Sequence, residues 1–250
     1  YEISACLVGS EMCIRDRIQK LELTPAMLAL DPCSGSIVVT DTETGQVRAM
    51  AIYPSYDNNK LTNVIDSDYY DKITSDKTTP MYNRATMQRT APGSTYKMLV
   101  SAAGLGEGVI DVGSVITDYG TFTKISPSPK CWLTGGHGAL GLAEAIEVSC
   151  NGFFYEVGYR LATDSNGVYQ DAQGIDKLQK YATLFGLNRK SGVEIEEIDP
   201  HISDSDAVRS AIGQGTNNYT PVQLSRYVTA IANEGKCYDP VSYTHLRAHE

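Results

Sequence analysis

The feature that most constrains this chain is a helix that is apolar on nearly all of its sides. The string Pro-Gly-Ser-Thr-Tyr-Lys ends at Lys97, and the apolar residues 98–105 follow it directly. We expect the helix to begin near Ser94, directly after the Pro-Gly pair, and to be stopped by Gly104, Gly106 and Gly108. A helix without a polar face belongs in a core, so other elements must pack around it. The apolar run is too short to cross a membrane, which takes about 18 residues or more.

The rest of the pattern predicts an α+β fold. Residues 36–40 and 46–52 are β-branched and apolar, and they flank a turn that ends at Gly45, which predicts a β-hairpin. Residues 54–80 are polar and predict a long surface segment. Helices are expected over residues 142–147, 152–161, 175–185 and 222–233. Strands first and helices afterwards indicate α+β with a helical subdomain.

Charge and cysteine spacing exclude some classes of partner. The 250 residues carry a net charge of −9, which argues against nucleic acid and against electrostatic binding to anionic lipid. No pair of cysteines has CxxC spacing, and outside the two ends of the chain only His137 and His201 accompany them. A zinc site is therefore not expected, and the default interpretation is small buried hydrophobic residues. This interpretation covers Cys33, Cys131, Cys150 and Cys237.

Both ends of the chain differ in character from residues 18–240. Residues 1–17 show no helical or strand period, and residues 241–250 hold two of the four histidines and no apolar pattern. We expect both ends to be translated sequencing adapters, with one domain over residues 18–240. The alternative is a pair of irregular native termini. Sequencing the source DNA distinguishes the two interpretations.

Ser94 and Lys97 form the first motif that can carry chemistry. Residues three apart lie on one face of a helix, about one turn from each other. A serine hydroxyl becomes nucleophilic when a base removes its proton, and a lysine can be that base when burial favours its neutral form. At the start of a helix, the backbone N–H of Ser94 can also stabilise an oxyanion. The structural alternative is an exposed helical pair without a catalytic role.

Two further strings matter only in combination with the first. Ser149-Cys150-Asn151 stands between two expected helices, where a hydroxyl and an amide can transfer a proton and bind a substrate amide. Its structural alternative is a helix cap, because Ser and Asn are preferred there. The third string is a turn that precedes the last expected helix, formed by Gly213, Gln214, Gly215 and Thr216. Its structural alternative is an ordinary loop.

Taken together, these strings resemble the transpeptidase domain of class B penicillin-binding proteins, of the penicillin-binding protein 2 type. The resemblance rests on four separated blocks, GSIVVTDTETGQVRAMAIYPSYD, NRATMQRTAPGSTYK, GLAEAIEVSCNGFFYEVG and AIGQGTNNYTPVQLSRYVTAIANEGK, and covers nearly all of residues 18–240. S-x-x-K with a following serine motif is a signature of such enzymes. The resemblance implies a serine β-lactamase/transpeptidase-like fold, with an antiparallel sheet flanked by helices plus a helical subdomain.

The same resemblance assigns roles to the motif residues. Ser94 would be the acylated nucleophile and Lys97 its general base. Ser149 would pass the proton to the leaving amine, and Asn151 would bind the substrate backbone and Lys97. The turn of Gly213, Gln214, Gly215 and Thr216 would support the wall of the active site.

The implied function is cross-linking of peptidoglycan stem peptides that end in D-Ala-D-Ala, with β-lactam antibiotics as covalent inhibitors. No cofactor or metal is implied. The parent protein would be anchored in a bacterial membrane, with its catalytic domain outside the cytoplasm, beside a lipid-linked glycan polymerase. The family's K-T-G strand is not found in this sequence, so we expect a fold that is truncated before its C-terminal strands and a fragment that is weakly active or inactive.

Three other functions remain as alternatives, one of them a purely structural module, which would keep its penicillin binding after Ser94→Ala. A related serine β-lactamase would hydrolyse a chromogenic cephalosporin rapidly. A non-enzymatic β-lactam sensor would be acylated and stay acylated, and it would not cross-link stem peptides.

Overall fold

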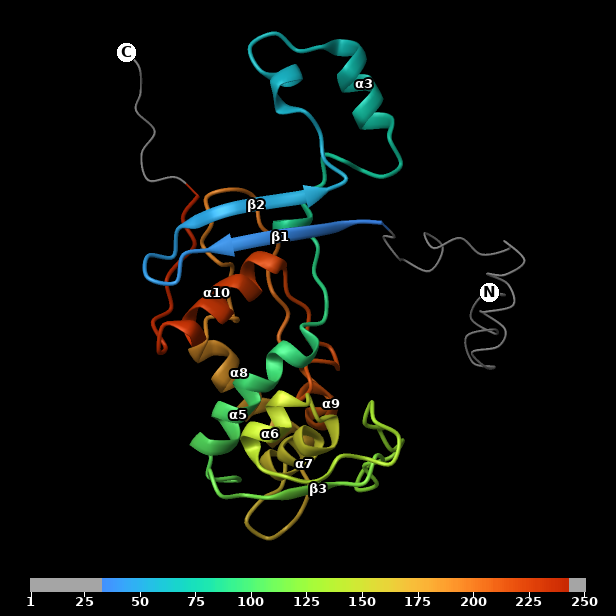
Figure 1. The fold of residues 1–250 in the computed structure, drawn as a ribbon, viewed down its shortest axis with the longest axis vertical. Coiled ribbons are helices and arrows are strands. Elements are labelled where there is room, and N and C mark those ends of the chain that lie inside the picture. Colours follow the sequence, from blue (N-terminus) through green and yellow to red (C-terminus); the bar gives the residue numbers. More distant parts are fainter. Residues whose placement is uncertain (1–32, 243–250) are drawn as a thin grey trace, which may run out of the picture. The chain divides into compact units, whose positions relative to one another are not determined.

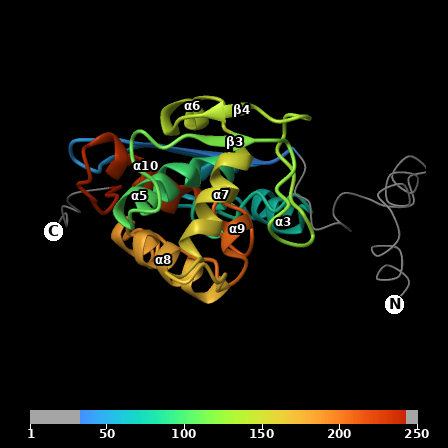
Figure 2. The ribbon, with the colours of Figure 1, turned by 90° about the horizontal axis from the view of Figure 1, so that it is seen from below.

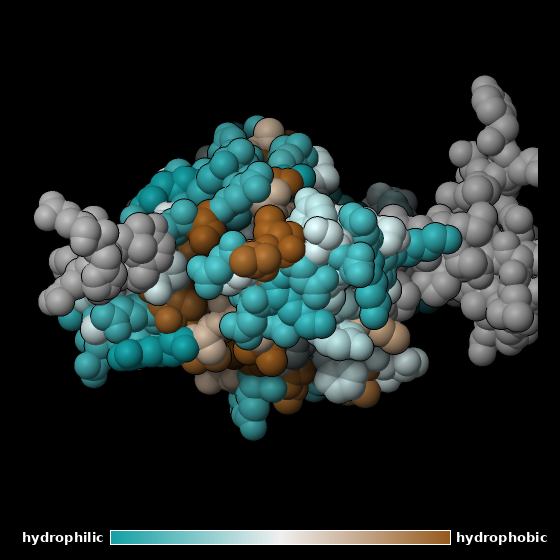
Figure 3. Space-filling model, turned by 90° about the horizontal axis from the view of Figure 1, so that it is seen from above, coloured by the Kyte–Doolittle hydropathy of each residue, from teal (hydrophilic) through white to brown (hydrophobic). Residues whose placement is uncertain are grey.

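The computed structural model describes residues 33–242. The described residues divide into two compact units, one formed by residues 33–35 and 52–81 and the other by residues 36–51 and 82–242. The expected adapter segment 1–17 lies outside the described residues, as does most of 241–250. Among the described residues, no helix has the length and apolar character that crossing a membrane requires. The face in Figure 3 is mainly hydrophilic, with hydrophobic residues in small separate groups.

The smaller unit contains a helix that the sequence analysis did not predict. A short 3-10 helix, η2 (Asn58–Leu61), precedes α3 (Ser67–Ser75) (Figure 1). The side chain of Asp66 caps α3 by accepting a hydrogen bond from the backbone N–H of Tyr69 at 3.0 Å. The only buried residue of α3 is Ile73, and the helix lies within a segment whose polar composition predicted only a surface position. Most residues of 54–80 are exposed, which confirms the expected surface segment.

The predicted hairpin is confirmed. Strands β1 (Gly35–Thr40) and β2 (Val47–Tyr53) form a two-stranded sheet, and Figure 1 shows them running in opposite directions. At the turn, the Asp41 carboxylate accepts hydrogen bonds from the backbone N–H groups of Glu43 and Thr44. Gly45 has the expected left-handed conformation, with φ of 73°.

The expected central helix forms in two parts. The 3-10 turn η3 (Gly93–Tyr96) leads into α5 (Lys97–Gly106), in which Leu99 is fully buried. The helix passes through Gly104 instead of stopping there. A Cβ at Gly104 would lie 2.9 Å from Ile110 and 3.0 Å from Val157, so this glycine serves close packing inside the helix.

Helices surround α5, as the sequence predicted. Figure 2 shows α5 beside α7 (Asn151–Leu161) and α8 (Asp171–Leu184), and both helices pack against it. The short helix α6 (Leu142–Glu147) has the predicted bounds, whereas α8 begins four residues before the predicted 175. The remaining helices of unit two are α4 (Arg84–Met87), α9 (Ala207–Ser210) and α10 (Pro221–Ala232).

A second pair of strands positions the loop beside α7. Strand β3 (Ile116–Asp118) pairs antiparallel with β4 (Gly138–Leu140), with Ile116 opposite Leu140 and Asp118 opposite Gly138. Each strand has three residues, too few to show an alternating pattern in the sequence. The described residues thus form two small sheets and a helical core, which is the α+β architecture that the sequence analysis expected.

Candidate active site

Ser94 and Lys97 lie in very different environments although they are one turn apart. Ser94 is exposed in η3, whereas Lys97 at the start of α5 has only 2 % of its surface exposed. The backbone N–H of Lys97 donates to the Ser94 carbonyl, which closes the 3-10 turn. Side chains at positions i and i+3 of a 3-10 turn eclipse each other. A solvent-accessible hydroxyl therefore stands over a buried amine, which contradicts the alternative of an exposed pair.

Ser149 lies in the connection between α6 and α7, and Asn151 is the first residue of α7. The structure makes Cys150 the N-cap of α7, because its sulfur accepts a hydrogen bond from the backbone N–H of Phe153 at 3.3 Å. Ser149 has a left-handed φ of 53°, an unusual conformation for a serine. Neither Ser149 nor Asn151 is the cap, so the structural alternative for this motif was wrong.

Four side chains from these two segments form one hydrogen-bonded group. The Lys97 ammonium donates to Asn151 Oδ1 at 2.7 Å, to the Ser149 carbonyl at 2.8 Å and to Ser149 Oγ at 3.0 Å. The Ser149 hydroxyl in turn donates to Ser94 Oγ at 2.9 Å. The route from nucleophile to lysine therefore runs through Ser149.

Burial changes the acid–base behaviour of Lys97. Removal of its ammonium from water lowers the pKa of Lys97 from 10.5 to about 8, although the nearby thiols of Cys150 and Cys131 act in the opposite direction. Its amine also lies 5.6 Å from the centre of the Phe154 ring. A lysine with this pKa has a substantial neutral fraction at mildly alkaline pH and can accept a proton.

One glycine of the predicted turn, Gly213, contacts the residue that precedes the nucleophile. The backbone N–H of Gly93 donates to the Gly213 carbonyl at 3.0 Å, and Gly213 has a φ of 71°. A Cβ at Gly213 would lie 2.1 Å from the Gly93 carbonyl oxygen. Gly213 thus lies directly against the turn that carries Ser94.

The other residues of that turn face elsewhere. The hydroxyl of Thr216 donates to Asp204 Oδ1 at 2.8 Å and also contacts Ser203. Gln214 and Gly215 are exposed. None of these three contacts the Ser94–Ser149–Lys97 group through a hydrogen bond between described residues.

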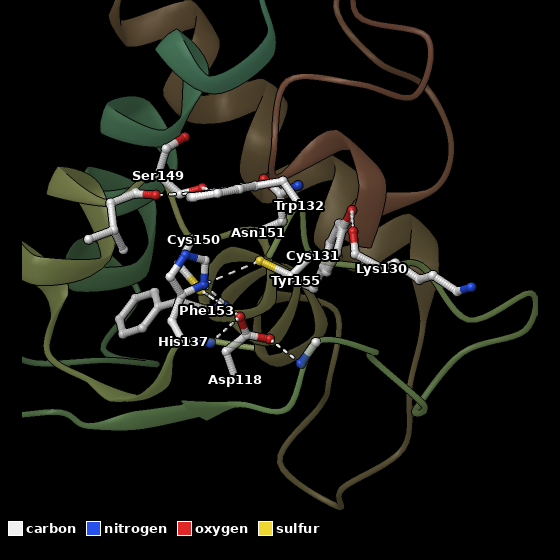
Figure 4. Close-up of polar contacts among 12 residues, drawn as sticks. Asp118, Lys130, Cys131, Trp132, His137, Ser149, Cys150, Asn151, Phe153 and Tyr155 are labelled. Atoms are coloured by element: carbon white, nitrogen blue, oxygen red, sulfur yellow. Dashed lines mark hydrogen bonds and ion pairs between the residues drawn. The ribbon is translucent and has the colours of Figure 1, made fainter. Parts of the chain in front are cut away.

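Beside the hydrogen-bonded group of Ser149 and Lys97 lies a cluster of four side chains, Asp118, Cys131, His137 and Cys150 (Figure 4). Their ligand-type atoms all lie within 4.8 Å of one another. The Asp118 carboxylate is 2.9 Å from His137 Nδ1 and accepts from the Cys150 thiol at 3.3 Å. Burial would raise the pKa of Asp118, but hydrogen bonds, first of all from His137, outweigh it and lower the pKa to about 2. Burial raises the pKa of Cys150 to about 12.

The cluster has the chemistry of a zinc site. Carboxylate, imidazole and thiolate are the ligands that zinc takes in tetrahedral sites. The buried Nε2 of His137 has no hydrogen-bond partner among the described residues. The expectation against zinc rested on spacing along the chain, whereas β3, the β3–β4 loop and the start of α7 bring these four side chains together; the expectation itself stays untested. These residues could hold a metal ion.

Trp132 connects the cluster to the serine motif. Its indole N–H donates to the carbonyls of Val148 and Ser149, at 3.2 and 3.1 Å. The ring lies edge-on to His137, with 5.0 Å between centroids, and 62 % of the residue is exposed (Figure 4). The sequence analysis did not single out Trp132, although it is the only tryptophan of the chain.

The chain matches a known protein family over most of its length. The model of a family described as "Penicillin binding protein transpeptidase domain" matches residues 35–248. The peptidoglycan D,D-transpeptidase MrdA of Haemophilus influenzae is 31 % identical over 228 residues, which cover 84 % of this chain and 33 % of that protein. Its counterpart in Escherichia coli strain K12 is 30 % identical over 217 residues, covering 80 % of this chain and 32 % of that protein. The chain thus spans about a third of the length of these relatives.

Solved structures are similar as well. Penicillin-binding protein PBP2 of Helicobacter pylori superposes with a TM-score of 0.73 at 28 % identity, covering 83 % of this chain and 40 % of that one. A penicillin G acyl-enzyme complex of penicillin-binding protein A from M. tuberculosis gives a TM-score of 0.68 at 27 % identity, covering 84 % and 48 %.

Proposed function

The chain belongs to the family of penicillin-binding protein transpeptidase domains, and on that premise we propose that it is the catalytic part of a peptidoglycan D,D-transpeptidase. The family and the serine transpeptidase fold expected from the sequence are confirmed. The observation that carries the proposal is the continuous hydrogen-bond path from Ser94 through Ser149 to the buried Lys97. The substrate would be a stem peptide that ends in D-Ala-D-Ala.

In the first half-reaction, Ser94 Oγ attacks the carbonyl carbon of the penultimate D-Ala. The hydroxyl proton moves to Ser149 as the Ser149 proton moves to the neutral amine of Lys97. The backbone N–H of Ser94 stabilises the oxyanion of the tetrahedral intermediate. When the intermediate collapses, the amide bond breaks and the terminal D-Ala leaves with a proton from Ser149, which Lys97 replaces. An ester between Ser94 and the shortened stem peptide remains.

The second half-reaction reverses the proton path. An amine of a neighbouring stem peptide attacks the ester carbonyl and loses a proton through Ser149 to Lys97. The bond to Ser94 then breaks, the proton returns to Ser94 Oγ, and a new amide joins the two stems. A β-lactam acylates Ser94 in the same way, but its leaving nitrogen stays attached to the acyl group, so the acyl-enzyme persists.

Asn151 would act on both the lysine and the substrate. Its Oδ1 accepts from the Lys97 ammonium at 2.7 Å, which fixes the orientation of the amide. The Nδ2 group at the other end of that amide is a donor suited to a substrate carbonyl. Gly213 would support the wall of the site through its contact with Gly93.

The acyl transfer itself uses only groups of the chain. If the cluster binds a metal ion, Asp118, Cys131, His137 and Cys150 would hold it, and the ion would supply a structural link between the β3–β4 loop and α7. Because Cys150 lies between Ser149 and Asn151, that link would hold the two neighbouring side chains in place.

The whole protein would work at the bacterial membrane. PBP2 of Helicobacter pylori has been solved in complex with MreC. A further neighbour, with a TM-score of 0.75 and 28 % identity, comes from a peptidoglycan synthase complex that coordinates polymerisation and cross-linking. The synthase complex supports a parent protein that acts beside a lipid-linked glycan polymerase, whereas its membrane anchor and outward orientation rest on the family resemblance alone.

Labelling with a fluorescent penicillin tests the proposal. We expect covalent label on Ser94, located by peptide mass spectrometry, and no label on Ser94→Ala. Labelling should be slow and less than stoichiometric, because no Lys-Thr-Gly is found in this sequence. Label on Ser94→Ala at the wild-type level would refute the proposal. Rapid turnover of a chromogenic cephalosporin would instead identify a β-lactamase.

A further inference from the structure

A tyrosine hydroxyl is inserted into the backbone ladder directly behind the nucleophile. Tyr227 lies on α10, and its hydroxyl donates to the Thr95 carbonyl at 2.9 Å and accepts from the Leu99 backbone N–H at 3.0 Å. Thr95 and Leu99 are four residues apart, which is the spacing of a direct α-helical hydrogen bond. The hydroxyl occupies the place of that bond.

The insertion coincides with a change of helix type. The turn Gly93–Tyr96 is 3-10, and α-helical structure begins only at Lys97. A side chain that inserts into the helical ladder is a known cause of such local distortion. Without the hydroxyl, Leu99 N–H and Thr95 C=O could satisfy each other, so Tyr227 is not needed to pair two buried polar groups. It changes the geometry of the turn.

That geometry aligns the nucleophile with the lysine. In a 3-10 turn, side chains three residues apart point in the same direction, whereas in an α-helix they differ by roughly 60°. Ser94 and Lys97 are three residues apart and stand at the junction of the two helix types. An α-helical first turn would rotate Ser94 Oγ relative to Ser149 and Lys97.

Tyr227 is held firmly in the core. It is fully buried, and its ring meets Phe185 edge-on at a centroid distance of 5.4 Å. Burial raises the pKa of Tyr227 well above its ordinary value, so the hydroxyl stays protonated and can donate and accept together. The chain just before α10 adds a second contact, because Tyr219 stacks on Tyr96 at 6.2 Å.

We propose that Tyr227 is a positioning residue that keeps the first turn of the nucleophile helix in its 3-10 form and thereby aligns Ser94 with Ser149 and Lys97. It touches neither substrate nor reacting atoms and acts through the backbone of Thr95 and Leu99. The proposal rests on the proposed acyl transfer for its effect on rate. Its claim about the hydrogen bonds of Thr95 and Leu99 is independent of the reaction and can be measured without it.

Tyr227→Phe is the test, with Tyr169→Phe as the matched control. Both changes remove one hydroxyl and keep the ring, and Tyr169 donates to Asp171 Oδ1 at 2.7 Å without contacting the nucleophile turn. Time courses of fluorescent penicillin labelling over a range of concentrations separate the dissociation constant from the acylation rate constant. For Tyr227→Phe we expect an acylation rate constant lower by about ten- to a hundredfold, because small misplacements of reacting groups cost that much. Its dissociation constant should be unchanged.

The control and a second readout keep the outcomes distinct. Tyr169→Phe should acylate at the wild-type rate, and Tyr227→Phe should lose no more thermal stability than Tyr169→Phe because a direct Leu99–Thr95 bond can form. Equal acylation by Tyr227→Phe and wild type would overturn the proposal. If the wild type takes no label, the proposed function fails, and amide exchange at Leu99 decides the question of the helix. If the amide of Leu99 exchanges at a different rate in Tyr227→Phe than in the wild type while the amides of α10 exchange as before, the insertion of the Tyr227 hydroxyl is supported. If the Leu99 amide exchanges at the same rate in both proteins, the insertion is refuted.

Discussion

The pH dependence of acylation gives the sharpest test of Lys97 as the base. Its pKa of about 8 follows from burial behind Ser149, where only 2 % of its surface is exposed. The neutral fraction of a group with this pKa rises about tenfold between pH 7 and pH 9 and then levels off. An unperturbed lysine, with a pKa near 10.5, would give a rise of about a hundredfold over the same range without a plateau.

Single-turnover labelling by a fluorescent penicillin from pH 6.5 to pH 9.5 measures this profile, with Ser94→Ala as the background. We expect the acylation rate constant to rise with a midpoint about pH 8, because the neutral amine accepts the proton from Ser149. A rate constant that stays flat between pH 7 and pH 9 would exclude Lys97 as the base. A steady rise without a plateau would show that its amine is not desolvated as the structure describes.

The lowered pKa of Lys97 also predicts how the stability of the folded protein depends on pH. Because the pKa of Lys97 is lower in the folded protein, the unfolded chain binds more protons between pH 8 and pH 10.5, and stability rises with pH through this window. Each pKa unit corresponds to about 1.36 kcal/mol, so the gain is on the order of 3 kcal/mol. Lys97→Met does not titrate, and the difference in unfolding free energy between the two proteins should show this rise in urea titrations. A constant difference would contradict the assignment.

Three further predictions concern the surroundings of the site. Gly213→Ala should lower the free energy of unfolding in urea by about 2–4 kcal/mol and abolish labelling. The added Cβ would collide with the Gly93 carbonyl, and the left-handed backbone at this position disfavours alanine. A variant that is stable and takes the label would contradict this prediction. Zinc at about a hundred times its dissociation constant should add about 2.7 kcal/mol of stability in thermal unfolding. His137→Ala and Cys131→Ala should remove that effect, and an equal gain in both variants would exclude the cluster as the site. Trp132→Phe keeps the ring but loses the indole hydrogen bonds to the serine motif, so labelling should slow several-fold, and unchanged labelling would show that the indole N–H does not position the motif.

Sequence patterns predicted the elements that bury an apolar surface along one continuous segment. The helix after Lys97, α6 and α10 and the hairpin around Gly45 all have local periodicity or turn signals, and the structure has them close to the predicted bounds. The Ser94 and Lys97 pair was also found, because a spacing of three residues places two side chains on one face of a helix.

Features that depend on contacts between distant segments were not predicted. The cluster around His137 takes one residue from the end of β3, two from the β3–β4 loop and one from a helix cap, and no spacing rule connects them. Cys150 replaced Ser149 and Asn151 as the cap because both of these side chains bind Lys97. The contact of the Tyr227 hydroxyl could not be predicted either, since only tertiary packing brings α10 against the first turn of α5.

The contact between Gly93 and Gly213 has a consequence for how the chain reaches its native state. These two glycines lie far apart in the sequence, yet the turn that carries Ser94 hydrogen-bonds to the later one. Bringing such distant segments together costs loop-closure entropy, so contacts of this kind slow folding. A ribosome-bound chain that has emerged only as far as α9 therefore already contains Ser94, Lys97, Ser149 and Asn151, but it lacks the contacts that Gly213 and Tyr227 make with the turn of the nucleophile. Reactivity is expected to arise late, when the segment from Gly213 to α10 docks, and this order keeps an exposed reactive serine from forming on a partly folded chain.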